Sequence, residues 1–396
     1  MSSIPHTLSR NKTKYILARL TPRVLTLALL GFTACRSRDF PQYAANYREY
    51  AYVANTGSNS VTVLDVVNLR VDRELVVGPG PVALAAGSSR NEVYVLTSGT
   101  AYMNGSVAVI DAEKNFVAAQ IQVGRNPVSI HLDSEGNKAY VANSGSNSIS
   151  VIDLKARREV ARFGAGEQPD AAVPSPDGKT LVVANRGANS VALLDPVSGK
   201  VRSVFENCPG AAAPAILADS SKVFVACSAG HQVMVISLAR AADRKPDQLE
   251  ALIDVGRAPV DVALKPDGGE LFVSNMLSGT ISEVVADSND VGGAYMIGEG
   301  PVRGLVSRDN ALLYVANLNS QYIAVYAIDD GKRTGSVHVG DGPSALAFSA
   351  AGHLLFATDS RSGDVAVIRT ATNSLFTLIP TGRTPTAIVD KSFTLP

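Results

Sequence analysis

The chain has 396 residues, 46% of them hydrophobic, and its 36 basic and 36 acidic residues give no formal net charge. Five of the basic residues and none of the acidic residues lie in residues 1–35, so the remainder carries a formal charge of −5. General nucleic-acid binding, which needs a basic surface, is therefore not expected. The absence of Trp and the 6% of aromatic residues leave few platforms for stacking sugars or bases.

Residues 1–35 have the pattern of an export signal. A basic flank with Arg19 and Arg23 precedes the apolar run Val24–Phe32, which at nine residues is too short to span a bilayer. Small residues then lead to Cys35, an arrangement that resembles a bacterial lipobox, in which cleavage precedes a lipidated cysteine. We predict an exported protein that is attached to the membrane through a lipid on Cys35. The alternatives are an ordinary cleaved signal and an uncleaved anchor.

Residues 36–49 show no periodicity and are predicted to be a tether. The rest of the chain, residues 50–396, repeats the unit seen in Tyr140–Asp153 (YVANSGSNSISVID): two apolar strands joined by a turn whose Gly145 and Asn147 tolerate positive φ. The repeats follow at five steps of 42 residues and two longer steps of 46 and 48, beginning at Tyr52, Tyr94, Tyr140, Val182, Phe224, Phe272, Tyr314 and Phe356. A period in this range is typical of a propeller, solenoid or array.

Each unit adds two further strands to this hairpin. The outermost strand ends in Val-Gly or a similar pair, as in Val117–Gly124, and a Pro follows shortly before the innermost strand of the next unit. Four short antiparallel strands in each unit fit a propeller blade. The chain enters at a second strand (Tyr50) and leaves after an innermost strand (Thr386–Asp390), so pairing these two strands would close the ring. We predict an all-β propeller of eight four-stranded blades closed by the C-terminal strand, with seven blades as the alternative.

The stretches 51–65 (AYVANTGSNSVTVLD) and 139–153 (AYVANSGSNSISVID) resemble the YVTN-type β-propeller repeat of the YncE-like family, within a larger lactonase-like and cytochrome-d1-like group. The resemblance covers residues 50–396 and implies a propeller fold, export and a motif without catalytic residues. Relatives that act on lactones or bind haem use residues outside the motif. Relatives are mostly seven-bladed, so eight complete units depart from the commonest pattern.

The sequence contains no recognisable catalytic or cofactor motif. It has no CxxCH, GxSxG or Walker motif, and no His lies in an HxH, HExxH or Cys/His cluster. His131 lies in an innermost strand and can approach the channel, where a haem-binding relative would place an axial ligand, but a packed histidine is the simpler interpretation. We predict no catalytic residue, no metal site and no cofactor. The recurring asparagines are interpreted as structural caps of their own turns: Asn55, Asn143, Asn185, Asn275 and Asn317.

Cys208 and Cys227 are the two cysteines that remain once Cys35 is assigned to the lipid anchor. Cys208 begins a crossover between units, and Cys227 replaces the Asn that ends the second strand in most units. Both positions lie at the same end of the blade, and export favours oxidation. A disulfide between them is predicted, with two buried free thiols as the alternative.

Six charged residues near the crossover prolines form the predicted binding surface: Arg125, Asp170, Arg257, Asp261, Arg303 and Arg383. The position two residues after the Pro is small in most units but charged at Asp261 and Arg303, and three of the arginines precede their prolines by two residues. Together these residues would form a partly basic channel mouth for a small anionic ligand. The simpler interpretation is the alternative in which Asp261 pairs with Arg303 across neighbouring units and the other arginines are solvated.

The favoured function is a non-enzymatic binding or scaffold protein, monomeric and lipid-anchored in the cell envelope, that holds an unknown protein or a small anionic ligand at a propeller face. A lactonase-like enzyme and a haem-binding or electron-transfer propeller are the alternatives. The enzyme would need three or more convergent polar residues, and the haem protein would need a histidine that faces the channel. The binding hypothesis requires neither.

Overall fold

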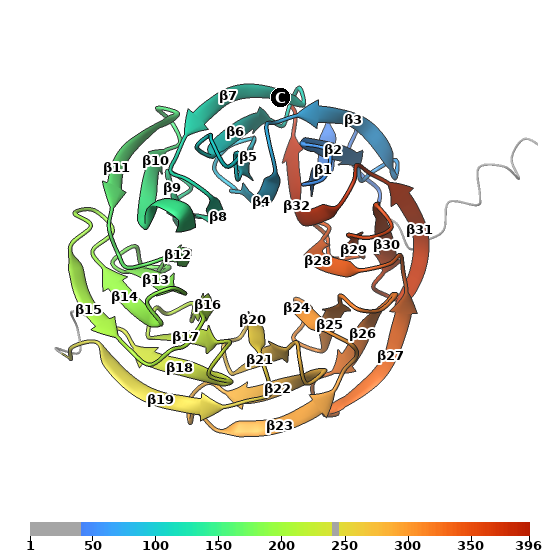
Figure 1. Cartoon of the computed structure of the whole chain (residues 1–396). Helices are drawn as coiled ribbons and strands as arrows, with labels where there is room; N and C mark the ends of the chain where they lie inside the picture. Colours follow the sequence, from blue (N-terminus) through green and yellow to red (C-terminus); the bar gives the residue numbers. More distant parts are fainter. Residues whose placement is uncertain (1–40, 240–244) are drawn as a thin grey trace, which may run out of the picture. The chain divides into compact units, whose positions relative to one another are not determined.

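The computed structural model describes residues 41–239 and 245–396, of which Tyr43–Pro396 belong to one compact unit. The described residues of this unit form eight four-stranded antiparallel sheets, which are arranged as blades in a ring (Figure 1). The predicted eight-bladed propeller is therefore confirmed. The predicted export signal and Cys35 lie outside the described residues. Within the described ranges, no helix is long and apolar enough to cross a membrane.

The blades share one plan, in which an innermost strand lines the centre and three further strands follow outward. From inside to outside, blade 1 contains β32 (Pro385–Thr394), β1 (Tyr47–Asn55), β2 (Ser60–Asp65) and β3 (Arg70–Val76). Blade 2 contains β4 (Pro81–Ala86), β5 (Glu92–Thr97), β6 (Ser106–Asp111) and β7 (Phe116–Gln122). Blade 3 contains β8 (Pro127–Leu132), β9 (Lys138–Asn143), β10 (Ser148–Asp153) and β11 (Arg158–Phe163), with the short 3-10 helix η1 (Ser144–Ser146) in its hairpin. Blade 4 contains β12 (Pro169–Pro174), β13 (Leu181–Asn185), β14 (Ser190–Leu194) and β15 (Val201–Phe205).

The remaining blades continue in the same order. Blade 5 contains β16 (Ala211–Ile216), β17 (Lys222–Cys227), β18 (Gln232–Ser237) and β19 (Gln248–Asp254). Blade 6 contains β20 (Pro259–Leu264), β21 (Glu270–Asn275), β22 (Thr280–Val285) and β23 (Val291–Met296). Blade 7 contains β24 (Pro301–Val306), β25 (Leu312–Asn317), β26 (Tyr322–Ala327) and β27 (Lys332–His338). Blade 8 contains β28 (Pro343–Phe348), β29 (Leu354–Asp359), β30 (Asp364–Arg369) and β31 (Ser374–Pro380).

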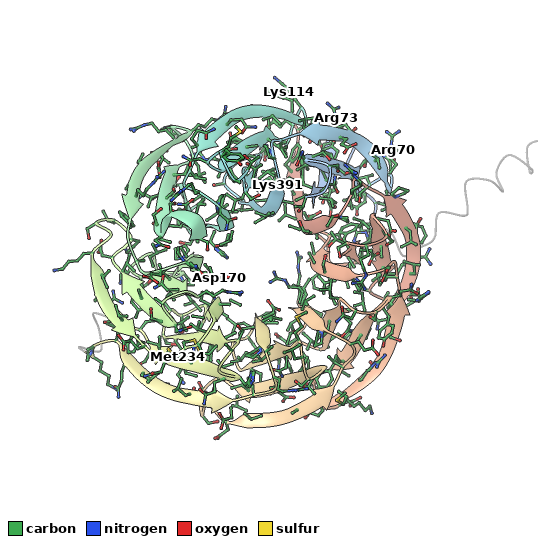
Figure 2. All side chains as sticks on the ribbon, in the orientation of Figure 1. Arg70, Arg73, Lys114, Asp170, Met234 and Lys391 are labelled. Atoms are coloured by element: carbon green, nitrogen blue, oxygen red, sulfur yellow. A yellow bond between two sulfur atoms is a disulfide. The ribbon has the colours of Figure 1, made fainter. Side chains whose placement is uncertain are left out.

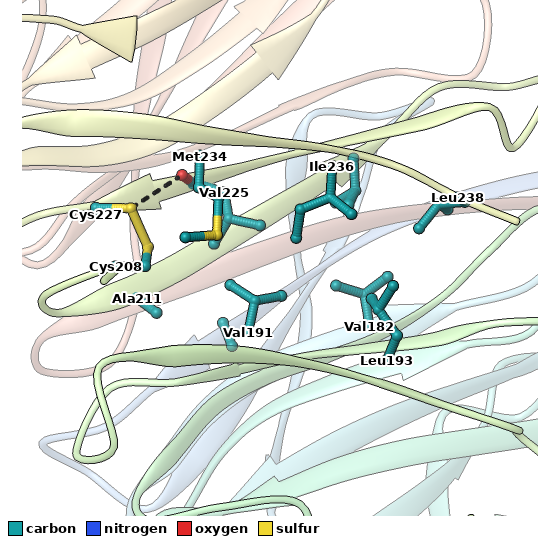
Figure 3. Close-up of a cluster of buried hydrophobic side chains, with 12 residues drawn as sticks. Val182, Val191, Leu193, Cys208, Ala211, Val225, Cys227, Met234, Ile236 and Leu238 are labelled. Carbon is teal, nitrogen blue, oxygen red and sulfur yellow. Dashed lines mark hydrogen bonds between the residues drawn. A yellow bond between two sulfur atoms is a disulfide. The ribbon is translucent and has the colours of Figure 1, made fainter. Parts of the chain in front are cut away.

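The hydrophobic core lies between neighbouring blades. The two middle strands of a blade are buried on both faces, which is why their sequences are almost continuously apolar, as in β5 and β6. The outermost strands alternate between partly buried and exposed residues, as in β11. Between blades 4 and 5, Val182 and Leu193 belong to the same buried cluster as Val225 and Ile236 (Figure 3). Each blade therefore needs its neighbours to bury its faces.

Ring closure pairs the two ends of the propeller. Strand β32 adds to the inner edge of β1, in a register that runs from Tyr47↔Thr394 to Ala54↔Ala387. The predicted closure by the C-terminal strand is thus present, and it removes the open edge of β1. Strand β1 begins at Tyr47, so residues 47–49, which were predicted to belong to the tether, pair with the end of β32.

A glycine in each of seven crossovers lies against the residue that ends the second strand. A Cβ atom on Gly124 would lie 2.6 Å from Cγ of Asn143, too close for any other residue. Instead, the Gly124 N–H donates to Asn143 Oδ1 at 2.9 Å, and Asn143 Nδ2 donates to Ser150 Oγ at 2.9 Å. Asn143 is therefore structural, as predicted, but it holds the incoming crossover and strand β10 rather than the turn that follows it. In that turn, Asn147 adopts the positive φ that was expected of it, 51°.

In blade 5, cysteines replace both members of this pair. Cys208 occupies the glycine position and Cys227 the asparagine position; their Cα atoms are 4.7 Å apart and the sulfurs are bonded (Figure 3). Both residues are fully buried. The crossover position and the end of the second strand lie too close together for a Cβ atom beside an asparagine. The same short separation is what a disulfide between the two positions requires.

The innermost strands carry a bulge directly after the crossover proline. In blade 7, Pro301 pairs with Asn317 and Arg303 with Ala316, so Val302 has no partner in the ladder. The same shift occurs in the other blades whose innermost strand begins with Pro. A bulge bends its strand and redirects the side chains around it.

Candidate functional site

The eight innermost strands line a central cavity of about 570 Å³. In five of the seven blades with a crossover proline, the residues one and two positions after the proline both contribute to the cavity wall, for example Val260 and Asp261. Most of the residues that line the cavity are aliphatic, but polar atoms make up most of its accessible surface. The polar side chains in the lining are Ser129, His131, Asp170, Arg186, Asp261, Arg303 and Thr386. Small-molecule and cofactor sites typically measure about 300–1,000 Å³, so the cavity has the size of such a site, with a more polar lining than usual.

Asp261 and Arg303 form an ion pair between blades 6 and 7. Arg303 Nη1 lies 2.8 Å from Asp261 Oδ1, and the Gly304 N–H donates to Asp261 Oδ2 at 2.8 Å. The Asp261 side chain is only 6% exposed, whereas that of Arg303 is 53% exposed. The pairing across neighbouring blades that was given as the alternative is therefore present, and it leaves one side of the guanidinium open to the cavity.

Asp170 and Arg186 form a second, more open ion pair in blade 4. Asp170, on β12, lies at the central opening of the ring (Figure 2), and its Oδ1 atom is 3.2 Å from Nε of Arg186. The two side chains are 30% and 52% exposed. Burial raises the pKa of the Asp170 carboxyl, and the positive charge of Arg186 partly opposes this shift.

His131, on β8, is a neutral base in the wall of the cavity. Burial and, to a smaller extent, the positive charge of Arg303 lower its pKa to about 4. Its Nδ1 atom has no hydrogen-bond partner among the described residues, and neither has the Ser129 hydroxyl two positions earlier. The cavity thus contains both a histidine that faces the channel and more than three convergent polar residues, which are the features that the haem and enzyme hypotheses require.

The remaining predicted site residues lie elsewhere. Arg125, Arg257 and Arg383 are exposed on the crossovers and do not line the cavity. Three of the six predicted residues, Asp170, Asp261 and Arg303, are brought together by the structure, and the other three are not part of this site. Among the described residues, no group of three or more His, Cys, Asp or Glu is arranged to hold a metal ion.

Arg186, which follows the last residue of β13, was not among the residues predicted from the sequence. A signal for it exists in the repeats. Arg186 is the single charged residue at this position of the repeat. The other seven blades carry uncharged residues there: Thr56, Ser98, Ser144, Ser228, Met276, Leu318 and Ser360. A comparison of the repeats at this position would have identified it.

Solved structures share the propeller fold with this chain. AztD from Citrobacter koseri aligns with a TM-score of 0.67 and 14% identity, covering 87% of this chain and 98% of AztD. The dihydro-heme d1 dehydrogenase NirN, in complex with DHE, aligns with a TM-score of 0.70 and 16% identity over 88% of this chain and 76% of NirN. A candidate 6-phosphogluconolactonase from Bacteroides fragilis aligns with a TM-score of 0.58 and 16% identity over 77% of this chain and 98% of that protein.

No family model and no curated protein matches the chain. The solved structures establish the β-propeller fold, and at these identities they establish nothing finer. Membership of the YVTN-type family stays a prediction from the repeat residues.

Proposed function

We propose that this chain is an exported binding protein that holds a small organic anion in the channel of its propeller. The observation that carries the proposal is the Arg303 guanidinium. Asp261 fixes it from one side, while about half of the side chain stays exposed at the central cavity. A guanidinium offers a planar fork of N–H donors that suits carboxylate and phosphate groups. Partial removal from water strengthens its attraction for an anion.

Capture is better supported than catalysis. A general base works best when its pKa is near the working pH, and the pKa of about 4 at His131 makes this imidazole a weak base. An activated nucleophile would be hydrogen-bonded to its base, but Ser129 Oγ and His131 Nδ1 both lack partners within the described residues. A lactonase-like enzyme therefore has the polar residues it needs but not their coupling.

Export and lipid attachment form part of the proposal. The basic, acid-free segment of residues 1–35 with its apolar run supports an export signal, and the position of Cys35 supports lipidation. The disulfide between Cys208 and Cys227 also supports an oxidising compartment, where such bonds persist.

The test is ligand binding by charge variants of the channel. A panel of organic anions is screened by thermal shift, and each hit is measured by isothermal titration calorimetry. Replacing Arg303 alone would leave Asp261 buried without its partner, so the informative variant is the double substitution Asp261→Asn with Arg303→Gln, which removes both charges and keeps a hydrogen bond possible. We expect this variant to bind at least about tenfold more weakly, equivalent to about 1.4 kcal/mol.

Arg257→Ala is the matched control, because Arg257 is an arginine that lies outside the cavity. It should bind with the affinity of the wild type. Weakened binding in Arg257→Ala together with unchanged binding in the double variant would move the site to the exposed crossovers. Absence of binding for the whole panel would contradict the proposed function.

A haem-type macrocycle is the second candidate ligand, and His131 is the observation that favours it. His131 is a neutral imidazole in the cavity wall, and a neutral imidazole can ligate iron, while Arg303 offers a partner for a carboxylate group of a macrocycle. NirN, which shares the fold, was solved in complex with DHE. Reconstitution with haem should then give a Soret band that His131→Ala shifts or abolishes, while an unchanged band in that variant would exclude His131 as the ligand.

A further inference from the structure

The two ion pairs of the cavity wall differ in how their carboxylates are held. Asp261 is nearly inaccessible and accepts two short contacts, from Arg303 Nη1 and from the Gly304 N–H, both at 2.8 Å. Asp170 has a single contact with a charged group, at 3.2 Å from Arg186 Nε, and its side chain is 30% exposed. The negative charge beside Arg303 is therefore buried behind the wall, whereas the negative charge beside Arg186 faces the same space as the arginine.

This difference determines what an incoming anion meets. An anion at Arg303 meets free N–H donors, with the carboxylate of Asp261 shielded behind them. An anion at Arg186 lies next to the accessible carboxylate of Asp170 and must either displace it or bear its repulsion. Like charges in a partly desolvated site repel far more strongly than in water.

The charge balance of the cavity leads to the same result. Among the described residues that line the wall, His131 is the only titratable group besides these two pairs, and it is uncharged at neutral pH because its pKa is lowered. The wall therefore carries two positive and two negative charges. A bound ligand with one anionic group gives the cavity a net charge of −1. A ligand with two anionic groups gives it a net charge of −2, which is more costly to bury.

We propose that the channel selects organic monoanions, with the anionic group on Arg303, and that Asp170 excludes a second anionic group by occupying Arg186. This inference rests on the proposed function and names its ligand class. Aliphatic residues of the wall, which include Val82, Leu84 and Val260, can contact the apolar part of a ligand. Asp170 is thus a specificity-determining residue rather than a ligand-binding one.

The test compares benzoate with isophthalate, two probes with the same ring and one or two carboxylates. Calorimetry on the full chain should show that the wild type binds benzoate at least about tenfold more tightly than isophthalate. In Asp170→Asn, which keeps the side-chain shape and removes the charge, isophthalate affinity should rise about tenfold or more, and benzoate affinity should change less than about threefold. Thermal melting verifies that the variant is folded.

Three outcomes would overturn the inference. Equal or tighter binding of isophthalate by the wild type would show that Asp170 does not exclude a second anionic group. An equal gain for both probes in Asp170→Asn would show general repulsion without selection. Either result leaves the proposed function standing, whereas failure of the wild type to bind any anion removes the proposed function and this inference together. Arg257→Ala should keep the wild-type preference.

Discussion

At the scale of single residues, Asp359 differs from the residue that most repeats have at its position, and this difference makes the stability of the protein depend on pH. It is fully buried in the position that is asparagine in five other blades, accepts a hydrogen bond from the Gly340 N–H at 3.0 Å, and lies directly opposite Asp364 in the ladder. Burial, followed by the hydrogen bond and charge of Asp364, raises the pKa of Asp359 to about 8. The folded protein therefore holds a proton here that the unfolded chain releases near pH 4.

Asp359→Asn should stabilise the protein, and by more as the pH rises. Because the folded pKa is raised, the wild type loses stability as the pH increases from about 4 to about 8, whereas the asparagine variant has no such dependence. We expect a gain on the order of 2 kcal/mol at pH 8 and little gain at pH 4. Thermal or urea unfolding at the two pH values measures the difference. An equal gain at both would contradict the explanation that the folded protein retains a proton on Asp359.

The cysteine pair permits a similar replacement by the repeat's own residues. The double variant Cys208→Gly with Cys227→Asn recreates the pair found in most blades, so it should fold but lose the cross-link, which closes a separation of 19 residues. We expect a loss of about 3 kcal/mol relative to the oxidised wild type. Reduction should lower the melting temperature of the wild type only. Thiol labelling of the denatured, unreduced protein should find no free thiol at either position, and two labelled thiols would refute the bond.

At the scale of elements, β32 is the strand on which the ring depends. It pairs with β1 along almost its whole length, and blade 1 has no other innermost strand. Val389 and Phe393 of this strand pack against the buried cluster between blades 1 and 2.

Deletion of residues 384–396 should therefore lower the melting temperature sharply, because it exposes the edge of β1 and uncovers this part of the core. We expect a loss of at least about 10 °C by differential scanning calorimetry. Deletion of Pro396 alone, which lies beyond the end of β32, is the control and should change little. If the variant without residues 384–396 melted at the same temperature as the full-length protein, the ring would not need this closure.

At the scale of the whole molecule, the predicted lipid anchor and the proposed ligand site belong to different parts of the chain. The anchoring prediction concerns Cys35, which lies outside the described residues. If Cys35 carries a lipid, Cys35→Ala should move the protein from the membrane fraction to the soluble extracytoplasmic fraction while leaving anion binding unchanged. Fractionation followed by immunodetection measures this, and membrane association that persists in the variant would indicate an uncleaved helix.

The sequence alone predicted the blades and the closure of the ring. It also favoured eight blades over seven and a disulfide over two free thiols. These features depend on local patterns that recur in register, such as the Asn147 turn, the crossover glycines and the phase in which the chain enters and leaves the repeat. The same residue pattern recurs in each repeat, so it can be recognised without any knowledge of long-range contacts.

Only the tertiary structure decided which polar residues meet. The ring brings Asp170 and Arg186 of blade 4 to the same cavity as Arg303 of blade 7, and it leaves Arg125 and Arg257 outside on the crossovers. In five blades, as in blade 4, two successive positions after the crossover proline line the channel, which strict strand alternation does not predict. Convergence of side chains from distant blades depends on closure of the ring, and no single repeat encodes it.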